Sequence, residues 1–267
     1  DNYLDLRPQD GIVRDEFWKT KEDIQAAVIG IYSSLLNSPP VPGASTLPIS
    51  QYLFMYGELR GDMVGQGQNV TEDQRDIMNS NIISSNELTS WAAFYRSINY
   101  CNTVIDLAPA VREEDPTLTQ TQLNNYLSEA LAIRGYLYFT LARTFKDVPL
   151  KLTATLSDSD NFQIAPSPQN EIFAQVIKDL KLAQEYAVED YGDIASNKGR
   201  ITTYTINAML ADVYLWTGNY QEALDATNKV IDSKKFSLID ASRSWYNTVY
   251  AKGNSTESIF EFQYTTS

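Results

Sequence analysis

The sequence predicts a mostly α-helical fold, in which helices pair into an irregular array with long loops and a few short strands. Two observations predict it. Six stretches place apolar residues three and four positions apart, the period of an amphipathic helix. Residues 214–231, YLWTGNYQEALDATNKVI, also join two such stretches through a Thr-Gly-Asn turn, which is typical of the joint between two packed helices in an array. Because one pair cannot bury its own apolar face, several pairs are expected to pack together.

The N-terminal elements follow from capping and breaking residues. A helix is predicted over 20–36, with Thr20 as its N-cap and acidic residues in the first turn, where the helix dipole favours them. Residues 37–85 are rich in Pro, Gly, Ser and Asn, and we expect one long loop there. A second helix is predicted over 87–108, and Pro109 is expected to end it.

The other helices are longer or more strongly amphipathic. They are predicted at 118–145, 168–189, 202–217 and 219–233. Ser167 is the expected N-cap of the helix at 168–189, and Pro168 its first residue, where the missing N–H costs nothing. Gly218 separates the last two helices.

Short extended pieces are predicted near the end of the sequence. The predicted extended segments are SLID, WYNTVYA and ESIFEFQY. In ESIFEFQY, the partial alternation of Ile259, Phe260 and Phe262 favours a strand. No partner strand follows it in the sequence, so we expect more chain downstream.

Composition excludes several classes of function. The 34 acidic residues outnumber 21 basic ones, and the net charge of −13 argues against nucleic-acid binding. With no histidine, the chain cannot form a Ser-His-Asp triad or a histidine-containing zinc site. Cys101, the single cysteine, falls on an apolar helix stripe and is expected in the core. No apolar run approaches the ~18 residues of a membrane span.

Catalysis would therefore depend on carboxylates. Glu58 and Asp62 stand four residues apart, and Asp73 and Asp76 three apart, but sequence alone cannot show two carboxylates facing one substrate. We predict that the protein is not an enzyme and uses no catalytic metal or cofactor; a structural calcium ion stays an open alternative.

The segment EALAIRGYLYFTLARTFKDVPL, residues 129–150, resembles the hallmark of SusD/RagB-type outer-membrane lipoproteins of Bacteroidetes. The matching positions are Glu129, Ala130, Arg134, Tyr136, Tyr138, Phe139, Arg143, Phe145, Asp147, Pro149 and Leu150. Lys146 stands where the family pattern has glycine. YLDLRPQD near the start, the helix pair around Gly218 and ESIFEFQY are also similar to the family, in the family's order.

The resemblance implies a surface glycan-binding protein seated over a SusC-like TonB-dependent transporter. It also implies an N-terminal lipid anchor, whose cysteine has been trimmed from this sequence, and a C-terminal part that is absent here. By the same resemblance, the tetratricopeptide-like scaffold contacts the transporter, and Glu129 and Arg134 are structural. A peptide-capturing RagB-like protein is the first alternative. An intracellular tetratricopeptide adaptor is the second.

Ligand binding in the family is carried mainly by variable loops, so the predicted ligand residues are polar and aromatic loop residues. An exposed aromatic ring can stack on the apolar face of a sugar, while polar side chains bond its hydroxyls. The candidates are Tyr56, Arg60, Asp62, Gln66, Asn69 and Arg75 in the long loop, with Trp245 and Tyr246 later in the chain.

Overall fold

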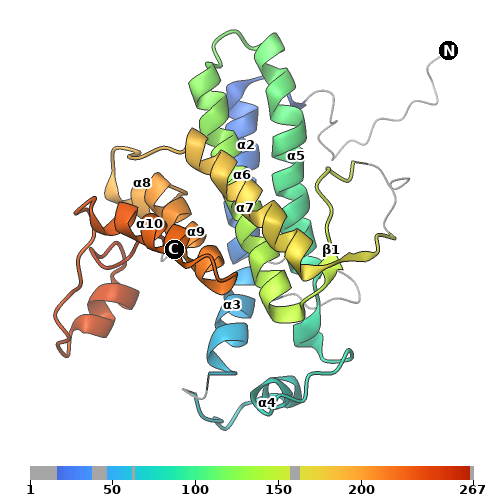
Figure 1. The fold of residues 1–267 in the computed structure, drawn as a ribbon, viewed down its shortest axis with the longest axis vertical. Helices are drawn as coiled ribbons and strands as arrows, with labels where there is room; N and C mark the ends of the chain where they lie inside the picture. The colour runs from blue at the N-terminus through green and yellow to red at the C-terminus, as the bar shows by residue number, and fades with distance from the viewer. Residues whose placement is uncertain (1–16, 38–46, 62–63, 157–162, 265–267) are drawn as a thin grey trace.

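The protein is mostly helical in a computed structural model that describes residues 17–37, 47–61, 64–156 and 163–264. Its main helices are α2 (Lys21–Leu36), α3 (Ile49–Glu58), α4 (Glu72–Met78), α5 (Ala92–Glu114), α6 (Gln120–Phe145), α7 (Gln169–Tyr186), α8 (Ile194–Gly199), α9 (Thr203–Trp216) and α10 (Tyr220–Ile231) (Figure 1). Two short turns, the 3-10 helix η1 (Glu87–Thr89) and the π-helix η2 (Asn247–Ala251), complete the helical part. Strands β1 (Val148–Pro149) and β2 (Pro166–Ser167) pair antiparallel.

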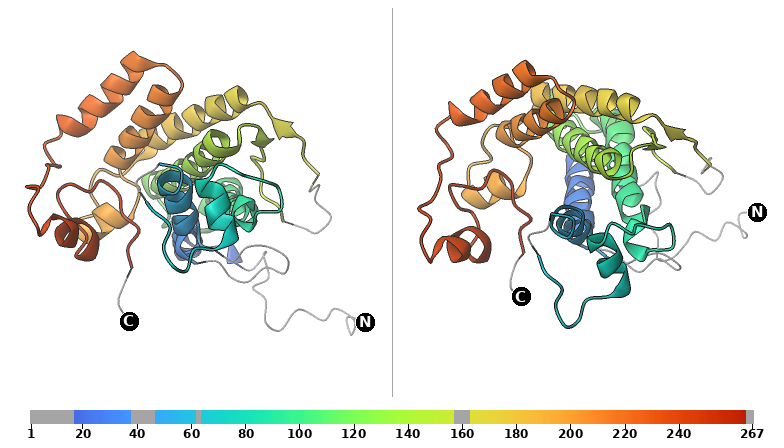
Figure 2. Two further views of the ribbon diagram at one scale, coloured as in Figure 1. Left: turned by 90° about the horizontal axis from the view of Figure 1, so that it is seen from below. Right: turned by 60° about the horizontal axis from the view of Figure 1, so that its bottom comes forward.

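The long helices pack in succession. Helix α6 lies between α5 and α7, α2 packs on α5 and α6, and α9 packs on α7 (Figure 1). Helix α10 packs on α9 and lies at the outer edge of the array (Figure 2). Each helix thus covers the apolar face that its predecessor leaves open, which is how an array of helix pairs builds one core.

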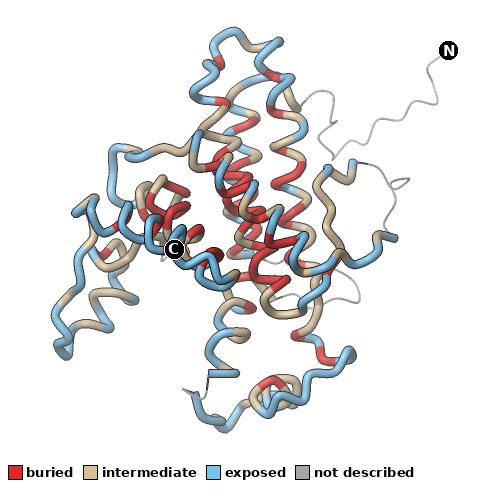
Figure 3. The backbone as a smooth tube through the Cα atoms, viewed as in Figure 1, coloured by how far each residue is buried: buried red, intermediate tan, exposed pale blue. Residues whose placement is uncertain are grey.

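The core is centred on α6, whose middle section is buried on nearly every side (Figure 3). Leu137, Tyr138 and Phe139 are each at most 2% exposed. Helix α7 approaches α6 closely at Gly135, where an added Cβ would lie 3.3 Å from the Leu180 Cγ. A helix that is buried on nearly every side requires neighbours on both sides, so α6 determines the layered arrangement.

Local capping chemistry sets several helix starts. The Thr20 side chain accepts a hydrogen bond from the Asp23 amide, and the Asp23 carboxylate accepts one from the Thr20 amide at 2.8 Å. Thr119 and Thr202 form the same reciprocal capping box at the starts of α6 and α9. These pairs satisfy amide groups that the first helical turn leaves free.

Three predictions in the first two-thirds of the chain are wrong. Residues 37–85 are not one loop, because they contain α3 and α4. Pro109 does not end a helix: it lies inside α5 on an exposed position, while neighbouring Ala108 and Val111 are buried and hold the helix in place. Pro168 is the N-cap of α7 rather than its first residue, and Ser167 belongs to β2.

The predicted strand in ESIFEFQY does not form within the described residues, and WYNTVYA contains the π-helix η2 instead of an extended piece. A strand needs a partner for its backbone groups. Here the segment makes isolated contacts, such as the hydrogen bond from the Glu261 amide to the Lys198 carbonyl oxygen at 2.8 Å. Lys198 lies in α8, a helix that the sequence pattern did not predict.

Candidate functional site

Tyr56 is part of the core packing rather than an open ligand residue. Its hydroxyl donates a hydrogen bond to the Leu88 carbonyl oxygen at 2.6 Å, and its ring stacks on Phe94 at 6.2 Å between centroids. Its ring also meets Phe145 edge-on at 5.6 Å. Burial raises the pKa of Tyr56 well above its ordinary value. The hydroxyl and ring face needed for a ligand are thus already used.

The other candidates of the first group lie on or between α3 and α4. Arg60, Gln66 and Asn69 are exposed. Arg75 is exposed too, and its guanidinium donates a hydrogen bond to the Val70 carbonyl oxygen at 3.2 Å. Asp62 lies outside the described residues. The four described positions are thus open to solvent, and no contact among the described residues joins them into one site.

The second predicted group forms an aromatic cluster around η2, which we call the η2 aromatic surface: Trp245, Tyr246 and Tyr250. The Tyr246 and Tyr250 rings lie 5.3 Å apart and are tilted by 38°, and Trp245 meets Tyr250 edge-on at 5.7 Å. Tyr246 is 68% exposed and Tyr250 66% exposed. Two large aromatic side chains are thus held side by side with most of their surface in water.

Trp245 is the anchored member of this surface. Its indole Nε1 donates a hydrogen bond to the Glu257 carboxylate at 3.1 Å, and the same carboxylate oxygen accepts from the Ile239 amide at 3.1 Å. This bridge ties η2 to the chain on either side of it. Tyr250 was missed by the sequence analysis. Its spacing of four residues from Tyr246 would have indicated it, had the segment been recognised as helical.

The structure does not join the two predicted groups into one site. Helices α3 and α4 lie at the lower end of the helical array in Figure 1, whereas η2 lies on the outlying segment after α10 (Figures 1 and 2). Of the two, the η2 aromatic surface has the composition that suits a ligand with apolar ring faces.

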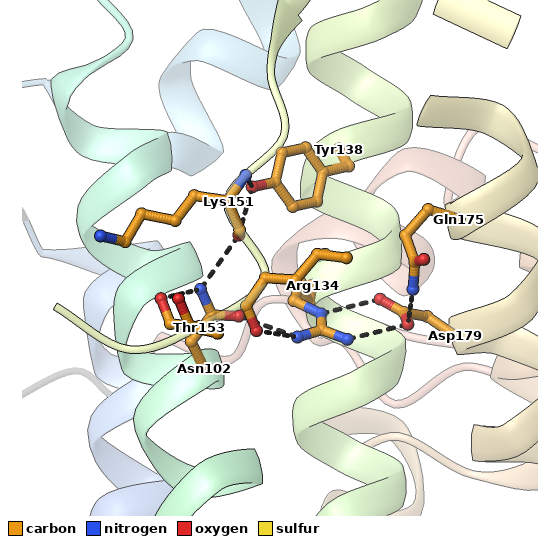
Figure 4. Close-up of polar contacts among 8 residues, drawn as sticks. Asn102, Arg134, Tyr138, Lys151, Thr153, Gln175 and Asp179 are labelled. Carbon is orange, nitrogen blue, oxygen red and sulfur yellow. Dashed lines mark hydrogen bonds and ion pairs between the residues drawn. The ribbon is translucent and has the colours of Figure 1, made fainter. Parts of the chain in front are cut away.

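The hallmark segment in α6 has a structural role, centred on Arg134. This side chain is 5% exposed and binds Asp179 of α7 through two hydrogen bonds of 2.7 and 2.8 Å (Figure 4). Its third nitrogen donates to the Asn102 side-chain oxygen at 2.9 Å and to the Leu152 carbonyl oxygen at 3.2 Å. Burial opposes the charge of Arg134, but Asp179 outweighs it and raises the pKa of Arg134.

The same network fixes the chain after β1. The Tyr138 hydroxyl donates to the Lys151 carbonyl oxygen at 2.7 Å and accepts from the Lys151 amide at 2.8 Å (Figure 4). The Asn102 amide donates to the carbonyl oxygens of Lys151 and Thr153, each at 3.1 Å. Residues 151–153 are therefore held against α5 and α6 although they have no strand partner.

Glu129 forms a second buried anchor. It is fully buried and accepts hydrogen bonds from the Tyr32 hydroxyl at 2.6 Å and from Arg200 at 2.6 and 3.0 Å. The Tyr32 hydroxyl in turn accepts from the Ile201 amide at 2.9 Å. Three parts of the chain far apart in sequence, α2, α6 and the connection between α8 and α9, thus meet at one carboxylate.

Lys146, which replaces the family's glycine, has a positive φ, a backbone conformation that glycine adopts more easily than other residues. Its φ is +70°, and its amide donates to the Ala142 carbonyl oxygen at the end of α6. The turn is thus retained at the cost of a strained backbone.

Among the described residues, no three His, Cys, Asp or Glu side chains lie close enough to hold a metal ion. Within the same part of the chain, every helix is too short or too polar to cross a bilayer. In the sequence, the spacing of Asp158 and Asp160 is similar to that of a calcium loop, but the glycine and terminal glutamate of such a loop are absent, which favours a solvated turn. Both residues lie outside the described part of the chain.

Comparison with known proteins identifies the fold and the family. Residues 3–215 match the SusD-like family whose description reads "Starch-binding associating with outer membrane". The chain belongs to the SusD-like family. It is 26% identical to SusD-like protein P38 of Formosa agariphila over 247 residues, a match that covers 92% of this chain and 44% of that protein.

Solved structures of SusD-like proteins have the same fold as this chain. A SusD superfamily protein from Bacteroides vulgatus superposes with a TM-score of 0.74 at 27% identity, covering 91% of this chain and 50% of the other. A laminarin-binding SusD-like protein shares the fold with a TM-score of 0.73 at 20% identity, covering 91% and 51%. The chain thus spans about half the length of these SusD-like proteins.

Proposed function

We propose that this protein binds an oligo- or polysaccharide at the cell surface, without catalysis, and delivers it to a SusC-like TonB-dependent transporter. Membership of a family described as starch-binding and associating with the outer membrane supports the glycan and the location. The laminarin-binding protein of the same fold supports the same class of ligand. An N-terminal lipid would hold the protein on the outer membrane. The intracellular adaptor alternative loses support, because the family description points to the outer membrane.

The η2 aromatic surface is the observation that carries the ligand class. A sugar ring has one face rich in C–H groups and a rim of hydroxyls, and a tyrosine offers an aromatic face and a polar tip. Tyr246 and Tyr250 are each about two-thirds exposed, at 68% and 66%, so both rings can be covered by a ligand.

Calorimetric titration of the full-length mature protein tests this function. The ligands are soluble starch, laminarin, further soluble polysaccharides and casein-derived peptides. Saturable heat from one glycan class is expected. Heat from peptides alone would instead establish the peptide-capturing alternative. Co-purification of the lipidated protein with a TonB-dependent barrel would support the transporter step, and its absence under mild extraction would contradict that step.

A double variant tests the site. Tyr246→Ala with Tyr250→Ala is expected to weaken glycan binding at least about fivefold, because two rings that each contribute about 0.5–1.5 kcal/mol by stacking contribute about 1–3 kcal/mol together. Tyr220→Ala is the matched control: Tyr220 is 70% exposed but lies on α10, so binding should not change. Equal effects of the two variants would argue against the η2 aromatic surface as the site.

A further inference from the structure

Helix α10 carries a line of large apolar side chains on its solvent side. Tyr220 is 70% exposed, Leu224 52% and Ile231 57%. Steps of four and seven residues return to nearly the same side of an α-helix, so the three side chains form one stripe, which we call the α10 stripe. Single exposed apolar residues are ordinary on a protein surface, but three in line on one helix indicate a face that packs against something.

The α10 stripe adjoins the face that α10 already buries. Ala223, Ala226 and Val230 are at most 8% exposed, and α9 is the helix on which α10 mainly packs. At 3.6 residues per turn, the buried residues and the stripe together span roughly 160° of the helix circumference. Packing on α9 covers one part of this apolar face, and no described segment covers the other.

The position of α10 explains why half of its apolar face is open. The earlier long helices have helix neighbours over their apolar faces, as α6 has in α5 and α7. Helix α10 lies at the outer edge of the array (Figure 2). An end unit that faces water normally has a polar outer surface. The α10 stripe is not polar, which indicates that one more helix follows α10 in the array.

The full-length protein is the source of such a helix that the observations favour. The chain spans 44% of SusD-like protein P38, and 50% and 51% of the two solved structures. A helix of the same polypeptide is held near α10 at a high effective concentration, whereas a separate partner must first associate. We propose that a helix from the part of the full-length protein that this chain does not span packs along the α10 stripe and extends the array by one unit.

The surroundings of the α10 stripe specify the chemistry of this helix. It needs apolar side chains three and four positions apart to fill the stripe. Asp225 follows Leu224 and Asp232 follows Ile231, so both acids lie on the same flank of the stripe. Both are exposed, and neither forms an ion pair within the described part of the chain. The helix that packs here should therefore carry Lys or Arg on the flank that faces them.

Thiol labelling of the full-length protein tests this packing. Cys101 is buried, so a cysteine placed on α10 is the accessible thiol among the described residues; labelling of the unsubstituted protein gives the background. Leu224→Cys should react with a maleimide at least about tenfold more slowly than Glu222→Cys, whose side chain is exposed on the opposite side of α10. In urea the two should react equally fast. Equal rates in the native protein would overturn the proposal, and protection that disappears on dilution would assign the stripe to a second copy instead.

Unfolding of the full-length protein in urea gives an independent readout. Leu224→Gln should lower the midpoint, because it buries an amide without a hydrogen-bond partner under the packed helix. Lys229→Gln is the matched control, because Lys229 is exposed on the other side of α10, and its midpoint should hardly change. If the midpoint of Leu224→Gln is no lower than that of the control, the stripe is open in the full-length protein and the proposal is wrong.

Packing on the α10 stripe and glycan capture can be tested separately, because neither of these readouts involves a ligand. Failure to bind any polysaccharide would leave the α10 packing intact. An open α10 stripe would equally leave glycan capture at the η2 aromatic surface intact. Tyr220→Ala shortens the stripe without removing Tyr246 or Tyr250, so its glycan affinity should match that of the wild type.

Discussion

Replacing Asp179 with asparagine should destabilise the protein strongly while hardly changing its shape. Asp179 is 3% exposed and is the only carboxylate bound to Arg134 within the described residues, through bonds of 2.7 and 2.8 Å. In Asp179→Asn the guanidinium stays buried without a counterion. Removing one partner of a buried pair typically costs about 3–5 kcal/mol. The Asn102 and Leu152 oxygens still accept hydrogen bonds from Arg134 in this variant. The free energy of unfolding should therefore fall by about 3 kcal/mol, the lower end of that range.

The assay is urea unfolding followed by circular dichroism at a helix-sensitive wavelength. The loss should appear as a lower midpoint with an unchanged slope. Asp212→Asn is the matched control, because Asp212 pairs with Arg143 at 3.1 Å but the side chains are 51% and 33% exposed. Exposed pairs contribute about 0–1 kcal/mol. A loss below 1 kcal/mol for Asp179→Asn, or one equal to the control, would refute the reasoning.

Further predictions concern Lys146, Cys101, Glu129 and metal dependence. Lys146→Gly should raise stability by about 1–2 kcal/mol in the same urea assay, because glycine adopts the positive φ without strain; no gain would show that the turn is unstrained. Burial raises the pKa of Cys101 to about 12, so the native thiol should not react with a disulfide reagent at pH 8, whereas the urea-unfolded one should react at once. Glu129→Gln should cost about 1–3 kcal/mol on unfolding, because Arg200 loses its carboxylate but is partly exposed to water. Prior treatment with EDTA should leave glycan titration unchanged, and a loss restored by Ca²⁺ would reveal a structural calcium ion.

The long helices could be predicted because their signals are local. An apolar residue every three or four positions predicts α2, α6 and α9, and a threonine before an acidic or amide-bearing turn adds a start signal for α2 and α6. The family resemblance of residues 129–150 could also be recognised from the sequence, because it depends only on the order of the amino acids.

Helices α3 and α5 show where local signals mislead. The Pro, Gly and Ser content of residues 37–85 indicates a loop, yet Ile49 and Tyr52 of α3 are fully buried against the core. Burial of this kind outweighs a weak intrinsic preference for helix. Pro109 would end an isolated helix, but packing of the residues around it carries α5 five residues further, to Glu114.

The sequence by itself determined the helical periodicity, the N-cap at Thr20, the excluded chemistries and the family resemblance. The tertiary structure decided which side chains are available to a ligand. Tyr56 lies in the short helix α3 and Tyr246 at the start of the short helix η2, yet Tyr56 packs on Phe94 with its hydroxyl bonded and Tyr246 is 68% exposed. Exposure depends on which distant segments pack over a residue, and no local pattern records that contact. The same reason hides the Trp91 N–H, which has no acceptor among the described residues, because only the folded chain decides which acceptors lie near it.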